Sequence, residues 1–249
     1  MCFVNREPLF NVPGIVLGLI AAFVIIHVVR LWLLSDEQDI DLLLLFAFIP
    51  VRYDTSVAGV FPGGLGAQVW SFVTYAFLHA NWPHVGLNTL WLLPFGSALA
   101  RRFGAVRFML FFVVTAAAGA LAHLLTHSGE QYPVIGASAA VSGAMAAAMR
   151  FAFQRGGPLS FFRGGDEEAY RVPALPLTGI VRDPRVIAFV VVWFGINILF
   201  GTGTVNVPGE DQPVAWEAHI GGFVAGLLLF SLFDPAVRRA ADQFDHRQQ

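Results

Sequence analysis

Apolar runs recur along the chain, and several of them are long enough to cross a lipid bilayer. They lie at about 12–34, 106–125, 186–200 and 216–234. A hydrocarbon core of roughly 30 Å needs about 20 apolar residues in a helix. Because only helices and closed barrels satisfy their own backbone hydrogen bonds in lipid, runs of this length predict membrane-spanning helices.

Two further apolar segments raise the predicted number of spans to six. The second span begins between Trp70 and His84 and ends before Arg101. The fourth span runs from Gly136 to about Phe153 and is built largely from Gly, Ala and Ser. Small residues of this kind are typical of helix contacts inside membranes, so the fourth span is expected to lie in the middle of the bundle.

The predicted fold class is therefore an all-α polytopic membrane protein, a six-transmembrane-helix bundle. One membrane domain is expected over 1–249, with its core at about 12–233. The segment Leu42–Pro50 is apolar but too short to span, so we expect it to lie in the interface or to re-enter the bilayer. The polar segments 154–183 and 234–249 are predicted to be a loop and a tail.

Composition agrees with a membrane protein and argues against several other classes. Of the 249 residues, 56% are hydrophobic and 13% are charged, whereas soluble domains carry about 25% charged residues. The formal net charge of −2 offers no basic surface for a nucleic acid. Cys2 is the single cysteine, which excludes an intramolecular disulfide and a cysteine cluster for a metal.

The arginines predict how the bundle is oriented. Six spans place both termini on one side, and thirteen of the 15 basic residues, all of them arginine, fall on that side. Only Arg30 and Arg52 fall on the other. Positively charged residues accumulate on the cytoplasmic side of membrane proteins. We therefore expect a multi-pass integral membrane protein with both termini in the cytoplasm.

The small-residue stretch 136–143 has two interpretations. In the first it is a packing surface, because Gly136 and Gly143 are seven residues apart and would share one face of a helix. In the second, Ser138 is a nucleophile near the start of a tightly packed helix, which requires a general base close by. The stretch alone does not decide between them.

Polar side chains on other spans favour the second interpretation. With the predicted topology, the segment 79–88, Ser138 and His219 all lie at the outer ends of their spans. His219 shares a helical stripe with Gly222 and Gly226, so it faces the same neighbouring helix as the glycines do. A small-residue partner helix would bring His219 within hydrogen-bond reach of Ser138, as a base-activated serine requires.

Three motifs together resemble those of the rhomboid intramembrane serine proteases. They are His79-x-x-x-x-His84-x-x-x-Asn88, Gly136-x-Ser138 and Ala218-His219-x-x-Gly222-x-x-x-Gly226. Each motif alone is a weak signal, but all three occur in the family's order and on its second, fourth and sixth helices. The resemblance covers the predicted membrane core from about Val12 to Phe233.

The resemblance implies a serine endopeptidase with a Ser-His dyad, Ser138 as nucleophile and His219 as base. The side chains of His84 and Asn88, with the backbone N–H of Ser138, would form the oxyanion hole. Supporting roles would fall to His79, Gly136, Gly222 and Gly226.

The substrates implied by the resemblance are transmembrane helices of other membrane proteins, cut near the outer membrane face. The expected setting is the lipid bilayer, most simply a bacterial inner membrane. The fifth span, with Trp193 and Phe194, would be a lateral gate. The resemblance implies no metal and no organic cofactor, and it leaves the oligomeric state open.

Three positions depart from the family's pattern. Ala139 follows the nucleophile where glycine is usual, so its methyl group could narrow the range of substrates. Ser142 stands where an aromatic ring often stacks on the histidine, so some other group would have to orient His219. Trp70-Ser71 replaces a Trp-Arg pair, and the arginine that anchors the family's first loop is missing.

Two alternatives remain open from the residues alone. His79, His84 and His219 are three imidazoles that could bind a catalytic Zn²⁺ in a membrane hydrolase, with Ser138 assisting. The chain could instead be a catalytically weak, rhomboid-like protein that binds membrane helices.

Overall fold

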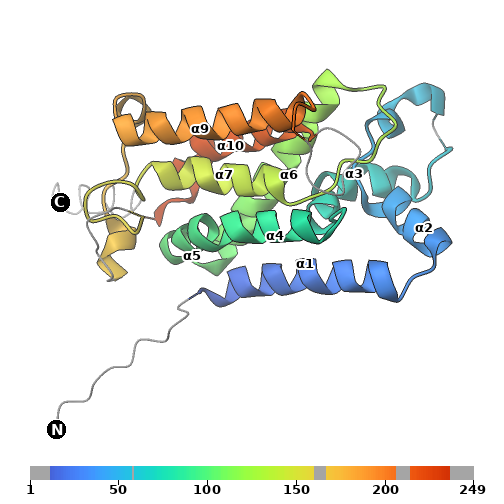
Figure 1. The fold of residues 1–249 in the computed structure, drawn as a ribbon, viewed down its shortest axis with the longest axis horizontal. Helices are drawn as coiled ribbons and strands as arrows, with labels where there is room; N and C mark the ends of the chain where they lie inside the picture. The colour runs from blue at the N-terminus through green and yellow to red at the C-terminus, as the bar shows by residue number, and fades with distance from the viewer. Residues whose placement is uncertain (1–11, 58, 160–166, 206–213, 236–249) are drawn as a thin grey trace, which may run out of the picture.

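The computed structural model describes residues 12–57, 59–159, 167–205 and 214–235. Cys2, part of the predicted 154–183 loop and most of the 234–249 tail lie outside them. The helices are α1 (Gly14–Trp32), α2 (Asp36–Phe46), α3 (Gly64–Thr74), α4 (Trp82–Trp91), α5 (Ser97–Phe103), α6 (Ala105–Thr126), α7 (Ser138–Met149), α8 (Leu177–Ile180), α9 (Pro184–Gly201) and α10 (Trp216–Phe233). The all-helical fold class is confirmed (Figure 1).

Four helices are long and apolar enough to cross a membrane among the described residues: α1, α6, α9 and α10. The other two predicted spans take a different form, so the number six stays a prediction. The chain is nevertheless a multi-pass, helical membrane protein, because several of its helices expose apolar side chains that water would not tolerate together.

The second predicted span is a composite of α4, a π-helical turn at Leu92–Gly96, and α5. Its first residue, Trp82, falls within the predicted interval of Trp70 to His84, and the apolar residues from 64 to 74 form the separate helix α3. Asn81 marks the true start, since its side chain accepts the backbone N–H of His84 at 2.9 Å. The predicted end was too early, because α5 continues through Arg101 and Arg102 to Phe103.

Helix α7 is short and central. It has 12 residues rather than the eighteen predicted, and every side chain from Ala139 to Met149 is buried. At 1.5 Å per residue it is only about 18 Å long, shorter than α6 and α10 against which it packs. Gly136 precedes the helix with φ of +116°. The prediction that Gly136 and Gly143 share a helical face is therefore wrong.

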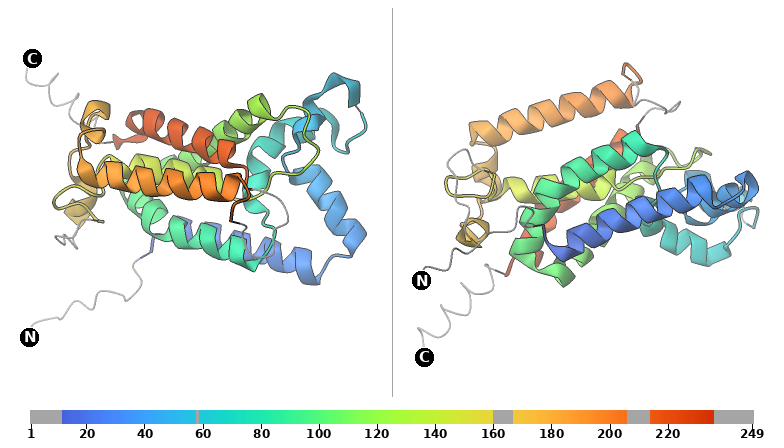
Figure 2. Two further views of the ribbon diagram at one scale, coloured as in Figure 1. Left: turned by 45° about the horizontal axis from the view of Figure 1, so that its top comes forward. Right: turned by 60° about the horizontal axis from the view of Figure 1, so that its bottom comes forward.

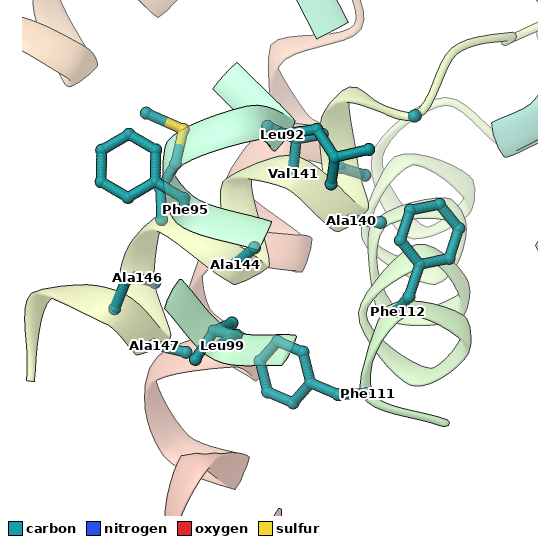
Figure 3. Packing of buried hydrophobic residues seen from close by; sticks show 14 of the residues in the cluster. Leu92, Phe95, Leu99, Phe111, Phe112, Ala140, Val141, Ala144, Ala146 and Ala147 are labelled. Carbon is teal, nitrogen blue, oxygen red and sulfur yellow. The ribbon is translucent and has the colours of Figure 1, made fainter. Parts of the chain in front are cut away.

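Helices α7 and α10 pack with their backbones in contact. A Cβ added to Gly222 would collide with the backbone of Ala139, and one added to Gly226 would collide with the backbone of Gly143. On the other side of α7, bulky residues of α5 and α6 such as Leu99 fill the core (Figure 3). This arrangement fixes how α7 and α10 lie against each other.

The segment between α1 and α4 forms a separate structure at one end of the bundle (Figure 1). Its first helix, α2, begins within the acidic stretch, because Ser35 and Gln38 form a capping box there. The guanidinium of Arg52, which is buried, donates to the carbonyls of Leu44 and Ala47. Trp70 Nε1 donates to the carbonyl of Leu45 at 2.8 Å. Arg52 and Trp70 thus hold α2 in place although Ser71 replaces the expected arginine.

At the opposite end of the bundle, a buried ion pair joins α5 to the end of α10. Arg102 Nη2 lies 2.8 Å from Asp234 Oδ2, and both side chains are at most 2% exposed. Arg102 also donates to the carbonyls of Tyr170 and Val172. A single guanidinium therefore ties the loop after α7 to α5 and to the end of α10.

Candidate active site

Ser138 and His219 lie next to each other at one end of the α7–α10 contact. Ser138 is the first residue of α7, and His219 lies in the first turn of α10. His219 Nε2 is 2.7 Å from Ser138 Oγ. At this distance a neutral imidazole whose Nε2 carries no hydrogen can accept the hydroxyl proton of the serine.

The other nitrogen of His219 contacts Asn197, which the sequence analysis did not single out. His219 Nδ1 lies 2.5 Å from Asn197 Oδ1, and Asn197 Nδ2 donates to the carbonyl of Trp193 at 2.8 Å. Because that carbonyl can only accept, the amide nitrogen must face it and the amide oxygen must face His219. Asn197 therefore favours the tautomer with hydrogen on Nδ1, which leaves Nε2 free to accept from Ser138.

The sequence contained a weak signal for Asn197. It is the single amide side chain of α9, which is otherwise apolar from Val186 onward, and it is 6% exposed. Intramembrane polar residues are functional candidates because they are costly to leave in lipid. Asn197 also contacts His219 directly and can therefore orient the imidazole, a role that the aromatic ring expected at the position of Ser142 would otherwise have had.

His84 and Asn88 reach the same site from α4. Both line the cavity that Ser138 and His219 line, and Asn88 Nδ2 donates to the carbonyl of His84 at 3.0 Å. The amide nitrogen carries two hydrogens, so one remains for a bound group. The imidazole of His84 lies against the α-carbon of Gly136, where a Cβ would be 2.5 Å from Nε2. Gly136 thus makes room for His84, and its positive φ is also suited to glycine.

The cavity has a volume of about 950 Å³ and opens between α4, α7, α9 and α10. Apolar side chains of α9, including Trp193 and Ile196, line the cavity together with the polar side chains of Ser138 and His219. A space of this size could accept an extended peptide segment. The cavity brings together the predicted nucleophile, base and oxyanion residues in one place.

The remaining predicted residues lie outside the cavity lining. His79 is fully buried, its ring 5.1 Å from that of His84, and Arg30 donates to its carbonyl at 2.8 Å. Gly222 and Gly226 lie in the α7–α10 contact. These three residues are placed to support the site rather than to touch a substrate.

The zinc alternative finds no support in this arrangement. His219 uses its two nitrogens toward Ser138 and Asn197. Among the described residues, the ligand atoms that come close enough to share an ion belong to a different group, His123, His127 and Glu130.

Ala139 and Ser142 have positions that follow from the packing of α7. Ala139 is buried, and its methyl group lies where a Cβ on Gly119 of α6 would collide with it. The methyl therefore points toward α6, and the idea that it narrows the substrate site is not supported. Ser142 is buried and lines the cavity one turn below Ser138.

The comparisons with known proteins agree with this geometry. A family model described as "Rhomboid domain" matches residues 66–234. The chain is 40% identical over 77 residues to Rhomboid-related protein 3 of Homo sapiens, covering 31% of this chain and 19% of that protein. It is 32% identical over 157 residues to Rhomboid protease GluP of Bacillus subtilis (strain 168), covering 63% and 24%.

A further relative is Rhomboid protease GlpG of Serratia proteamaculans (strain 568). It is 27% identical over 162 residues, which cover 65% of this chain and 47% of that protein. The chain thus spans less than half the length of each of these relatives. The family model nevertheless matches well over half of the chain and includes every candidate site residue from α4 to α10. On these grounds, the chain belongs to the Rhomboid family.

Proposed function

We propose that this protein is an intramembrane serine endopeptidase that cleaves transmembrane helices of other membrane proteins near the outer membrane face. The observation that carries the proposal is the 2.7 Å contact between Ser138 Oγ and His219 Nε2, inside a large cavity of a membrane-embedded bundle. Membership of the Rhomboid family supports the proposal, and two relatives of the chain carry the name Rhomboid protease. The proposed setting is a bacterial inner membrane with both termini cytoplasmic.

The proposed reaction is acyl transfer through the serine. His219 Nε2 takes the hydroxyl proton of Ser138 while Oγ attacks the scissile carbonyl carbon. The resulting imidazolium keeps its Nδ1 hydrogen bond to Asn197, whose role is to position the base. His219 then gives the proton to the leaving amine, and water hydrolyses the acyl-enzyme by the same steps in reverse order.

The oxyanion of the tetrahedral intermediate needs donors on the other side of the carbonyl. His84 and Asn88 are one helical turn apart on α4 and line the same cavity as Ser138. With the backbone N–H of Ser138 they form the proposed oxyanion hole. Donors fixed in a site from which water is largely excluded stabilise developing charge more than the same groups do in water.

Labelling with a fluorophosphonate tests the proposed nucleophile. We expect the probe to label the protein at Ser138 and to label neither Ser138→Ala nor His219→Ala, and both variants should lose cleavage by at least about a thousandfold. Ser142→Ala is the matched control, because it removes a second serine from the same cavity. Labelling that persists in Ser138→Ala but disappears in Ser142→Ala would refute the dyad. A folded protein that takes up no label would favour a helix-binding function.

A second variant tests the oxyanion donor. Removing one such donor lowers turnover on the order of 10² to 10³-fold, so Asn88→Ala should cut with a strongly reduced kcat and a nearly unchanged Tm. If Asn88 only clamps its own helix, the variant should melt earlier and cut at a near-normal rate per folded molecule. The hydrogen bond to the His84 carbonyl is local, so we expect the first result.

A further inference from the structure

Four ionisable side chains gather at the C-terminal end of α6, apart from the proposed dyad. His123 and His127 are four residues apart at the end of this helix. Glu130 follows in the loop that leads toward Ser138, and Glu217 reaches in from the first turn of α10. All four line the rim of the cavity that holds Ser138, yet the proposed reaction uses none of them.

Their ligand atoms are close together. One ligand atom from each of His123, His127 and Glu130 lies within 4.8 Å of the others. His123 Nε2 is 3.2 Å from Glu130 Oε2. Glu217 approaches both imidazoles, since its carboxylate oxygens lie 3.8 Å from His123 Nδ1 and 3.8 Å from His127 Nε2. Ligands of a tetrahedral Zn²⁺ at 2.0–2.1 Å lie roughly 3.3 Å apart, so the side chains would turn and draw together when the ion binds.

His123 provides an independent observation that points to a ligand. Its side chain is only 5% exposed. Neither ring nitrogen makes a well-directed hydrogen bond within the described residues, although Nε2 lies 3.2 Å from Glu130 Oε2. A buried imidazole without well-directed hydrogen bonds gains from a further ligand. One of its nitrogens belongs to the group of three ligand atoms, and His123 therefore points into the proposed site.

His127 is already oriented for binding. Its Nδ1 lies 2.8 Å from the hydroxyl of Thr126, which leaves Nε2 directed at the group. A hydrogen bond to one imidazole nitrogen commonly sets which nitrogen binds a metal. The rings of His123 and His127 are nearly parallel, 4.6 Å apart at their centres, and the C-terminal end of a helix favours a cation.

We propose that His123, His127 and Glu130 bind one divalent transition-metal ion, with Zn²⁺ the best fit. Two imidazoles and one carboxylate match the nitrogen and oxygen ligands of Zn²⁺ and leave a fourth position open. Glu217 adds a second negative charge beside the group. The bound ion would join the end of α6 to the loop before Ser138. This inference does not rest on the proposed protease activity.

Metal binding can be measured on the full chain in detergent micelles after treatment with EDTA. Titration with Co²⁺, a spectroscopic substitute for Zn²⁺, should produce visible absorption bands of a tetrahedral site that saturate at one ion per chain and disappear when Zn²⁺ is added. His127→Ala and Glu130→Gln should each weaken binding by more than about tenfold. Glu130→Gln preserves shape, so it remains informative if a histidine variant folds poorly.

Two sets of controls locate the ion. His246→Ala removes a histidine elsewhere in the chain and should leave binding unchanged. His219→Ala should also retain binding, because His219 belongs to the dyad. Unaltered Co²⁺ affinity in both His127→Ala and Glu130→Gln would overturn the proposal. Loss of binding in His219→Ala alone, or no saturable binding at micromolar metal, would overturn it as well. None of these measurements requires proteolytic activity, so a negative result for metal binding is distinguishable from a negative result for the proposed protease.

Discussion

Helix α10 packs against α6, α7 and α9, and its contacts with α7 and with α9 differ in kind. Against α7 it packs backbone to backbone, because Gly222 and Gly226 leave no room even for a Cβ. Against α9 the contact is made by side chains, chiefly the stacked rings of Trp193 and Phe223, 4.4 Å apart at their centres. Figure 2 shows α9 lying outside the packed bundle, and only Val186, Trp193 and Asn197 of α9 are buried.

The candidate site therefore depends on two helix contacts of unequal strength, a tight one between α7 and α10 and a looser one between α9 and α10. The α7–α10 contact sets the distance between Ser138 and His219. The α9–α10 contact favours one tautomer and orientation of His219, the proposed base, through Asn197. Few buried apolar contacts are characteristic of elements that open at low free energy. Asn197, the proposed positioning residue, therefore lies on α9, which is the more weakly held of these two helices.

Removing Asn197 should give the largest effect that this comparison predicts. Asn197→Ala leaves His219 without a partner for Nδ1, and misorientation of a catalytic group can lower turnover on the order of 10²-fold. We expect kcat to fall, with a small change in Tm. Asn197→Asp, which keeps an acceptor oxygen, should recover most of the rate with an altered pH profile. Normal turnover and an unchanged pH profile in Asn197→Ala would show that α9 plays no part in orienting the base.

A pair of glycine variants tests the packing of the two contacts directly. Gly222→Ala places a methyl group against the backbone of Ala139 and should reduce the free energy of unfolding by about 1–3 kcal/mol. Gly195→Ala is the matched control on α9, since nothing lies within 4 Å of its Cβ position. It should be neutral or stabilising by up to about 1 kcal/mol. Unfolding in micelles monitored by circular dichroism measures both, and equal effects would remove the distinction between the two neighbours.

The smallest predicted effect concerns the aromatic pair of the weaker contact. Stacked rings are worth about 0.5–1.5 kcal/mol beyond burial, so a double-mutant cycle of Trp193→Leu and Phe223→Leu should give a coupling free energy in that range. Both side chains remain apolar in the variants, which limits other changes. A coupling near zero would mean that α9 is held to α10 mainly by Asn197.

Much of the site could be predicted from the sequence because its chemistry is carried by residues at fixed helical spacing. His84 and Asn88 are four apart, and His219 shares a stripe with Gly222, so their faces follow from helix geometry alone. Asn197 could not be assigned in this way. An amide in an apolar span is equally consistent with an ordinary interhelical hydrogen bond, and only tertiary packing shows that it faces His219.

The predicted boundaries of the central helices were inaccurate for different physical reasons. The predicted start of the second span was left as wide as Trp70 to His84, although Asn81 followed by Pro83 is a start signal that could have narrowed it. The end of α7 carried no such signal. The sequence stays apolar after Met149 with Phe151 and Ala152, but the helix ends there and the chain turns. The Arg150 guanidinium donates to the carbonyl of Leu175, a contact that the local sequence does not reveal.

The buried pair of Arg102 and Asp234 has a consequence for synthesis of the chain. The two residues are 132 positions apart, so at ribosomal speeds Arg102 emerges roughly 7 to 26 s before its carboxylate partner. A buried guanidinium without that partner is destabilising by several kcal/mol. Helices α4 to α9 can thus form early, but the end of the bundle that holds Arg102 closes only when α10 arrives. A nascent chain truncated before Asp234 would leave the Arg102 guanidinium without its carboxylate partner.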